Sequence, residues 1–323
     1  MPIRGRGAHV VTVGHGSLGA KCAFIFPGQD APRARMGLDL AARSASAAAL
    51  LDRAAEIAGI DVRRALERGG PALDRTSVLQ PVIVAVLLGV AGELMRQGVS
   101  PALVAGHSLG EIAAWSATGA IAPEAAIAAA ATRGRLMERE ARLHPGGMLA
   151  LTRIGQETLD QALACGRARG RLDLAARNAV DEWVVTGEES ALRAVAARFP
   201  STRLSSLGPW HSPALADAED ELRAALMAIP RIPARARFIA NRTGRAVEDE
   251  ADIPDLLAGQ LTRPVAWLET LDFLAASDVT DIVVLGPVRP HAALARSRLG
   301  ERAQVWTSET IDEISSAAEA LRS

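Results

Sequence analysis

Two glycine-rich stretches of the sequence have the residue types and spacing to support chemistry. Residues 14–19 read GHGSLG and fit G-x-G-x-x-G, the turn that binds a dinucleotide. Residues 106–111 read GHSLGE and contain G-x-S-x-G, the turn that presents a nucleophilic serine. The first pattern predicts a redox cofactor and the second a covalent ester, so the surrounding residues must decide between them.

The residues after the first stretch argue against a dinucleotide site. Gly19 is followed by AKCAFIFPGQ, an apolar run typical of a strand that ends in a Pro-Gly turn. A dinucleotide fingerprint needs a helix at this point, because the pyrophosphate binds at the helix N-terminus. Residues 14–19 are therefore interpreted as part of an N-terminal leader, residues 1–21.

The second stretch has the setting that a nucleophile requires. GVSPALVAG before it indicates a turn and a short strand, and EIAAWSATGAI after it has the apolar period of a helix. Gly106 and Gly110 relieve crowding where the chain reverses. Ser108 then stands at a helix N-terminus, which favours developing negative charge. We predict that Ser108 is a nucleophile; the alternative is a serine that only caps the helix.

A serine hydroxyl needs a base to take its proton. His107 is adjacent but on the wrong side of a sharp turn, so it is expected to pack or to bond locally. His211, in GPWHSPAL, lies where two lobes of the chain should meet and is the predicted base. The six histidines have no ligand spacing, so no metal site is expected.

The composition is that of a globular enzyme without a strong overall electrostatic field. Of 323 residues, 49% are hydrophobic and 23% charged, and the net charge is −1, which gives no sign of a nucleic-acid or membrane partner. The chain has no N-terminal apolar h-region and no run of 18 apolar residues. Its two cysteines, far apart in the sequence, fit a reducing compartment. We expect a cytoplasmic protein.

The remaining pattern alternates strands and helices, which predicts an α/β fold with a mostly parallel sheet covered on both faces. The expected elements are a strand at 23–26, helices near 45–58, 81–97 and 123–142, a helix from about 213, a strand at 237–241, helices around 253–275, a strand at 281–286 and a closing helix–strand–helix tail.

Residues 146–208 have a different rhythm. MLAL, LDLAA, EWVVTG and STRLSS read as strands, with helical segments after the first and the third of them. This β-α-β-β-α-β order is the ferredoxin-like signature. We therefore predict a small ferredoxin-like subdomain, residues 146–208, inserted into a catalytic body that comprises residues 22–145 and 209–323.

Ten short motifs occur in an order that resembles the malonyl-CoA:acyl carrier protein transacylase family, which includes the acyltransferases of fatty acid and polyketide synthesis. They are FPGQ (26–29), LQPVIVAV (79–86), GHSLGE (106–111), TRGRLM (132–137), GGMLAL (146–151), NAVDEWVVTG (178–187), WHSPAL (210–215), NRTG (241–244), RPVAW (263–267) and LGP (285–287). The resemblance implies an α/β-hydrolase-like body with an inserted ferredoxin-like subdomain, in agreement with the elements above.

The resemblance also assigns roles to single residues. Ser108 would be acylated, with His211 as its base, and the backbone N–H groups of Gln29 and Leu109 would form the oxyanion hole. Arg133 matches the arginine that holds the malonyl carboxylate, a role that suits a guanidinium fork; the alternative is a solvated helix arginine.

Further roles concern the walls of the pocket. Gln80 and Asn178 match polar positions that line it. A backbone carbonyl orients the histidine in this family, and the region of Gly286 and Pro287 is the expected source.

The sequence departs from the family pattern at three places. GQDAP (28–32) replaces the usual GQGSQ, so Asp30 puts a negative charge near the thioester entrance, and Glu182 stands where the family often has Gln. Trp210 precedes His211, where malonyl-type polyketide enzymes tend to have Phe and methylmalonyl types Ser. Trp210 is expected to shrink or reshape the acyl pocket, or only to pack between the lobes.

Together these residues predict an acyltransferase that moves malonyl from CoA to the phosphopantetheine thiol of an acyl carrier protein. Ser108 would carry the acyl group as an ester, without a metal or redox cofactor. The departures favour polyketide or other secondary metabolism, with the protein acting in trans. Two alternatives are an acyl-carrier-protein hydrolase, which Arg133 disfavours, and an inactive subunit that docks carrier protein, which the intact set of site residues disfavours.

Overall fold

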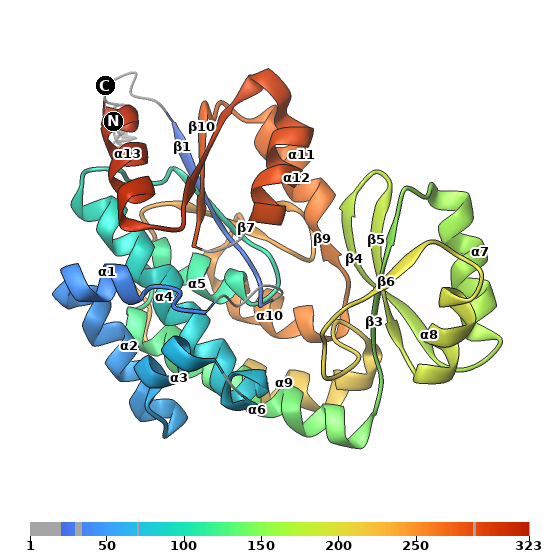
Figure 1. The fold of residues 1–323 in the computed structure, drawn as a ribbon. Helices are drawn as coiled ribbons and strands as arrows, with labels where there is room; N and C mark the ends of the chain where they lie inside the picture. Colours follow the sequence, from blue (N-terminus) through green and yellow to red (C-terminus); the bar gives the residue numbers. More distant parts are fainter. Residues whose placement is uncertain (1–20, 30–33, 70, 287–288, 323) are drawn as a thin grey trace, which may run out of the picture.

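The computed structural model describes residues 21–29, 34–69, 71–286 and 289–322. Asp30 and nearly all of the expected leader lie outside these ranges. Two lobes make up the described chain: a large body and a smaller lobe, drawn in green to yellow in Figure 1.

The body is built on a six-stranded sheet of order β11-β10-β1-β2-β7-β8, surrounded by helices (Figure 1). The first five strands are mutually parallel and β8 is antiparallel at the edge, as an α/β fold requires. The strands are β1 (Cys22–Phe26), β2 (Leu103–Gly106), β7 (Arg237–Ala240), β8 (Arg245–Ala246), β10 (Asp281–Leu285) and β11 (Gln304–Ser308).

The helices of the body follow the predicted order and add two that the pattern did not predict, α1 and α3. They are α1 (Leu38–Arg43), α2 (Ala45–Ala58), α3 (Val62–Arg68), α4 (Thr76–Arg96), α5 (Gly110–Ala117), α6 (Pro123–Leu143), α9 (Ala216–Met227), α10 (Ile253–Gly259), α11 (Trp267–Ala276), α12 (Arg289–Leu299) and α13 (Ile311–Arg322).

Helix α4 is the central helix of the body and differs from its predicted range. It begins at Thr76, five residues before the expected start, and continues through Pro81, which lies inside the helix and removes one of its backbone hydrogen bonds. By length and composition α4 could cross a membrane, but 89% of its most apolar window is buried inside the protein. It packs against α2 and α6 and is a core helix.

The small lobe contains the predicted β-α-β-β-α-β order. Its elements are β3 (Gly147–Thr152), α7 (Gln156–Arg167), β4 (Leu172–Ala179), β5 (Glu182–Gly187), α8 (Glu189–Ala196) and β6 (Ser201–Arg203). The sheet order is β6-β3-β5-β4-β9, in which β9 (Val265–Ala266) of the body pairs parallel with β4. The fold is therefore α/β with a ferredoxin-like unit, as predicted.

Alternating side chains of the small sheet serve two cores. Leu149 and Val185 pack beneath α7 and α8, which cover the sheet face turned away from the body (Figure 1). Met148 and Val184 belong instead to the main core. Because successive side chains of a strand point to opposite faces, one face of this sheet packs against the body and the other against α7 and α8.

Candidate active site

The turn between β2 and α5 forces Ser108 into a strained conformation. Ser108 has φ 51°, in the left-handed region that non-glycine residues rarely adopt. A Cβ at Gly110 would collide with the carbonyl oxygen of Phe26, and one at Gly106 with the backbone of Gly110. Both positions therefore require glycine. The Ser108 backbone N–H donates to Asn241 Oδ1 at 2.7 Å, which holds the turn in place.

His211 lies against Ser108, as predicted for a base. The Ser108 Oγ to His211 Nε2 distance is 2.8 Å, and His211 Nδ1 lies 2.9 Å from the backbone oxygen of Gln260. With Nδ1 donating to that carbonyl, Nε2 is left to accept the serine proton. Burial, and then the positive charge of Arg133, lower the pKa of His211 to about 3, so the imidazole is neutral at neutral pH.

The expected source of the orienting carbonyl was wrong. The oxygen belongs to Gln260, not to the region of Gly286 and Pro287, and Pro287 itself lies outside the described residues. Gln260 begins a short 3-10 turn, Gln260–Thr262, that packs against the turn Pro213–Leu215 just after His211. This packing brings the carbonyl of Gln260 to the imidazole.

Arg133 points at the nucleophile from α6, although its side chain is buried and only 1% exposed. Its Nη2 donates to Ser108 Oγ at 3.2 Å and to Gln260 Oε1 at 2.9 Å. Its Nη1 is buried and has no hydrogen-bond partner among the described residues. Burial lowers the pKa of Arg133 to about 10, so the guanidinium stays charged at neutral pH. One charged donor beside Ser108 is thus unused.

Three buried polar residues support this arrangement, and sequence reasoning gave none of them a role. Gln260 Nε2 donates to the Ser108 carbonyl at 2.9 Å and also to Glu111 Oε2. Glu111 Oε1 accepts from the Asn241 backbone N–H at 2.7 Å. Burial raises the pKa of Glu111 to about 8, against the opposing effect of these donors and of two nearby arginines. Glu111 and Asn241 lie in the motifs GHSLGE and NRTG, whereas Gln260 has no local signal.

Gln29 bonds to Gln80 and shares the lining of one cavity with Trp210, the residue before His211. Gln80 Nε2 donates to Gln29 Oε1 at 2.9 Å, and Gln80 Oε1 has no partner among the described residues. Gln29 and Trp210 line a cavity of about 370 Å³, together with residues of α4, Met148 and the segment 204–207. Trp210 is only 4% exposed, and its indole nitrogen has no hydrogen-bond partner in the described structure. Leu109 caps the N-terminus of α5 directly after Ser108.

Asn178 connects the small lobe to the turn that carries Ser108. Asn178 Oδ1 lies 3.1 Å from His107 Nε2, and Asn178 Nδ2 donates to Glu182 Oε1 at 3.0 Å. His107 also packs edge-on against the rings of Trp267 and His291. His107 thus contacts the small lobe, whereas His211 faces the hydroxyl of Ser108.

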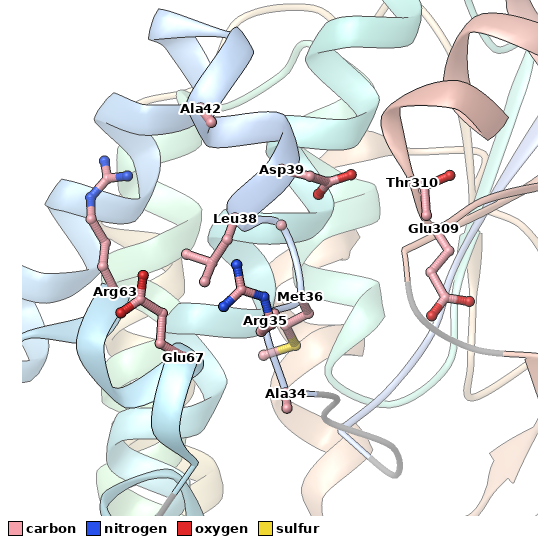
Figure 2. A pocket seen from close by; sticks show the side chains of 11 residues that line it. Ala34, Arg35, Met36, Leu38, Asp39, Ala42, Arg63, Glu67, Glu309 and Thr310 are labelled. Carbon is pink, nitrogen blue, oxygen red and sulfur yellow. The ribbon is translucent and has the colours of Figure 1, made fainter.

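Another cavity, of about 570 Å³, lies away from these residues. It opens between α1, α3 and the segment after β11, and Figure 2 shows two arginines, Arg35 and Arg63, among three acidic side chains in its lining, Asp39, Glu67 and Glu309. None of the predicted site residues reaches it. Within the described ranges no three His, Cys, Asp or Glu side chains form a metal-ligand group.

Comparison with known proteins gives the same assignment as the geometry. Residues 23–303 match the acyl transferase domain family. The chain is 36% identical to the malonyl CoA-acyl carrier protein transacylase of Mycobacterium tuberculosis over 69% of its own length and 75% of that protein. It is 31% identical to the spectinabilin polyketide synthase system protein NorB of Streptomyces orinoci, over 87% of the chain and 13% of NorB.

Comparison with a solved structure shows that the fold is shared as well. The acyl-carrier-protein-S-malonyltransferase of Bartonella henselae superimposes with a TM-score of 0.86 at 25% identity, covering 94% of this chain and 100% of that one. The chain therefore belongs to the acyl transferase domain family and, within it, to the malonyl-CoA:acyl carrier protein transacylases.

Proposed function

We propose that this protein moves a malonyl group from CoA to the phosphopantetheine thiol of an acyl carrier protein through an ester on Ser108. The observation that carries the proposal is that Arg133 Nη1, a buried charged donor, has no hydrogen-bond partner among the described residues. The other terminal nitrogen of the same guanidinium, Nη2, lies 3.2 Å from Ser108 Oγ. A carboxylate on the acyl group would pair with Nη1, whereas an acyl group without a carboxylate would leave it unpaired.

The reaction would proceed in two balanced steps. His211 Nε2 takes the Ser108 proton as Oγ attacks the thioester carbonyl, and the C–S bond breaks as the CoA sulfur receives that proton from His211. In the second step His211 takes the proton of the phosphopantetheine thiol, whose sulfur attacks the carbonyl of the seryl ester. The bond between that carbonyl carbon and Ser108 Oγ breaks as Oγ receives the proton from His211. The backbone N–H groups of Leu109 and Gln29 would stabilise the oxyanion in both steps.

Arg133 would also link substrate binding to the strength of the base. Its positive charge helps to keep the pKa of His211 low. A malonyl carboxylate bound to Arg133 would offset that charge, so the pKa of His211 would rise when the correct acyl group arrives. Proton transfer to His211 would then be favoured in the loaded site over the empty one.

The side chains around the cavity would select the acyl group. Trp210 lines the cavity beside Gln29 and would limit the size of a substituent at C2 of malonyl. Gln80 and Asn178 would offer amides to the acyl group and to the pantetheine arm. The likeness to a polyketide synthase system protein supports a place in polyketide or other secondary metabolism. We propose that the protein works in trans in the cytoplasm, and its two free cysteines agree with a reducing compartment.

A transfer assay tests this proposal. The purified protein is mixed with malonyl-CoA and a separate holo acyl carrier protein, and intact mass spectrometry follows malonyl on both proteins. We expect malonyl-carrier protein with the wild type and a loss of at least about 10⁴-fold in rate with Ser108→Ala. Release of free malonate without transfer would favour a hydrolase, and an unacylated protein that binds carrier protein would favour a docking subunit; either result contradicts the proposal.

A further inference from the structure

Glu111 is a buried carboxyl group for which the proposed reaction has no use. It lies in the first turn of α5, three residues after Ser108, and its side chain is 0% exposed. Both of its oxygens accept N–H groups, Oε1 from the Asn241 backbone and Oε2 from the Gln260 amide. We propose that Glu111 is a positioning residue that fixes Arg133 for the malonyl carboxylate by setting the orientation of the Gln260 amide. This inference rests on the proposed function and deepens it.

The two ends of the Gln260 amide make different contacts. Its Nε2 faces Glu111 and the Ser108 carbonyl, and its Oε1 accepts from Arg133 Nη2 at 2.9 Å. If the amide turned over, Nε2 would face the guanidinium and Oε1 would face the Ser108 carbonyl. Donor would then meet donor and acceptor would meet acceptor. Both Glu111 oxygens accept N–H groups in the structure, which is the pattern of a carboxylate, and these donors stabilise the ionised form against the burial that raises its pKa. This pattern excludes the turned-over orientation, because a carboxylate only accepts hydrogen bonds.

The Gln260 amide connects Glu111 to Arg133, the residue proposed to bind the malonyl carboxylate. Among the described residues, Arg133 donates hydrogen bonds only to Gln260 and Ser108. The orientation of the Gln260 amide therefore sets the direction of the guanidinium. The positive charges of Arg133 and Arg242 favour the ionised form of Glu111, which burial disfavours. Held in this way, Arg133 keeps Nη1 free beside the nucleophile.

Glu111→Gln breaks this arrangement with almost no change in shape. The backbone N–H of Asn241 cannot turn, so the new side chain must keep its Oε1 toward Asn241 and its Nε2 toward Gln260. Two NH₂ groups then meet, and the Gln260 amide must either shift away from residue 111 or turn over; both changes move the group that holds Arg133. We expect kcat/KM for malonyl loading from malonyl-CoA to fall roughly 10- to 100-fold, the loss for one hydrogen bond to a charged group. Acetyl loading from acetyl-CoA should stay within about threefold, because acetyl does not use Arg133.

The ratio of the two loading rates separates positioning from a structural role. General damage to the fold would lower both rates together, and a thermal melt monitors it. Glu93→Gln is the matched control, since Glu93 is only 5% exposed but pairs with Arg96 on α4, and both rates should be unchanged. Glu111→Asp is a second variant: it keeps the charge but withdraws the carboxylate from Gln260, and it should show the same selective loss.

A double-mutant cycle tests the route through Gln260. Gln260→Met removes the amide and keeps the backbone carbonyl that orients His211, so it should lower malonyl loading selectively. Adding Glu111→Gln to it should change the loading ratio by less than about twofold, because the two residues act in series. Equal losses for both acyl groups, an unchanged ratio in folded Glu111 variants, or additive effects in the cycle would overturn the inference. Failure of the wild type to load malonyl would instead overturn the proposed function.

Discussion

The active site has two parts that differ in how completely their polar groups are satisfied. The floor comprises Ser108, His211, Arg133, Gln260, Glu111 and Asn241, all buried and joined by hydrogen bonds from one residue to the next. The rim comprises Gln29, Gln80, Ser206 and Trp210. Polar atoms of Gln80, Ser206 and Trp210 have no partner in the described structure.

This difference separates the residues that hold the reacting groups and the acyl carboxylate from the residues that limit the size of the acyl group. A fully bonded floor holds a serine, a base and a cation in one geometry, as preorganised catalysis requires. The rim borders a cavity and leaves donors and an acceptor for an incoming group. The exception in the floor is Arg133 Nη1, the atom proposed to meet the substrate. Changes to the floor should therefore have large effects on malonyl loading, and changes to the rim should have smaller effects, on which substituent at C2 is accepted.

The largest effect expected from a binding residue is that of Arg133→Ala in the floor. Malonyl loading would leave a carboxylate unpaired in a buried site, a penalty of roughly 3–5 kcal/mol, or about 10²- to 10³-fold or more in kcat/KM. Acetyl loading should hold or rise, because acetyl has no carboxylate. Pre-steady-state loading of both acyl-CoAs measures the two rates. Arg135, on the exposed side of α6, supplies the control variant Arg135→Ala. Equal losses with both substrates would make Arg133 a structural residue.

A smaller effect is expected from Trp210→Ser in the rim. The indole limits the space beside the acyl group, so the wild type should prefer malonyl to methylmalonyl by roughly 10- to 200-fold. The smaller side chain should narrow this ratio, chiefly by admitting methylmalonyl. Competition between the two CoA esters gives the ratio of kcat/KM directly.

The fold of this variant must be checked, because removing a buried aromatic ring costs roughly 3–5 kcal/mol. If the folded Trp210→Ser protein keeps the wild-type ratio, Trp210 only packs between the lobes.

The smallest change should be the response of the floor to mild acid. Burial and Arg133 lower the pKa of His211 to about 3, so the base is neutral at pH 5 and loses activity only as the pH falls toward 3. Acetyl loading should therefore be nearly equal at pH 7 and pH 5. A histidine with the ordinary pKa of 6.5 would be about 30-fold less available at pH 5. A 30-fold drop in the loading rate would show that His211 is not held in this environment.

The sequence predicts the helices and strands that carry the site better than the contacts between its buried polar side chains. The strand, turn and helix around Ser108 and the β-α-β-β-α-β order follow from local apolar periods and glycines, and both are confirmed in the fold. Ser108 and His211, 103 residues apart, are placed in contact by the structure.

No comparable sequence pattern predicts which buried polar groups will contact one another. Gln260 reaches Ser108 from 152 residues away, on a turn with no motif of its own. The orienting carbonyl was therefore assigned to the wrong segment. The expected start of α4 is wrong as well, because the helix begins at Thr76 and continues through Pro81, and no local pattern shows that this proline is tolerated.

The most direct test of the central claim is to find which acyl group the protein keeps, and on which residue. The protein is incubated with equal amounts of malonyl-, methylmalonyl-, acetyl- and long-chain acyl-CoA, and intact mass and peptide mapping identify the adduct. We predict one malonyl group, on Ser108, and we expect the Arg133→Ala protein to lose this preference for malonyl. A long-chain or methylmalonyl adduct on the wild type, or malonyl on a residue other than Ser108, would contradict it.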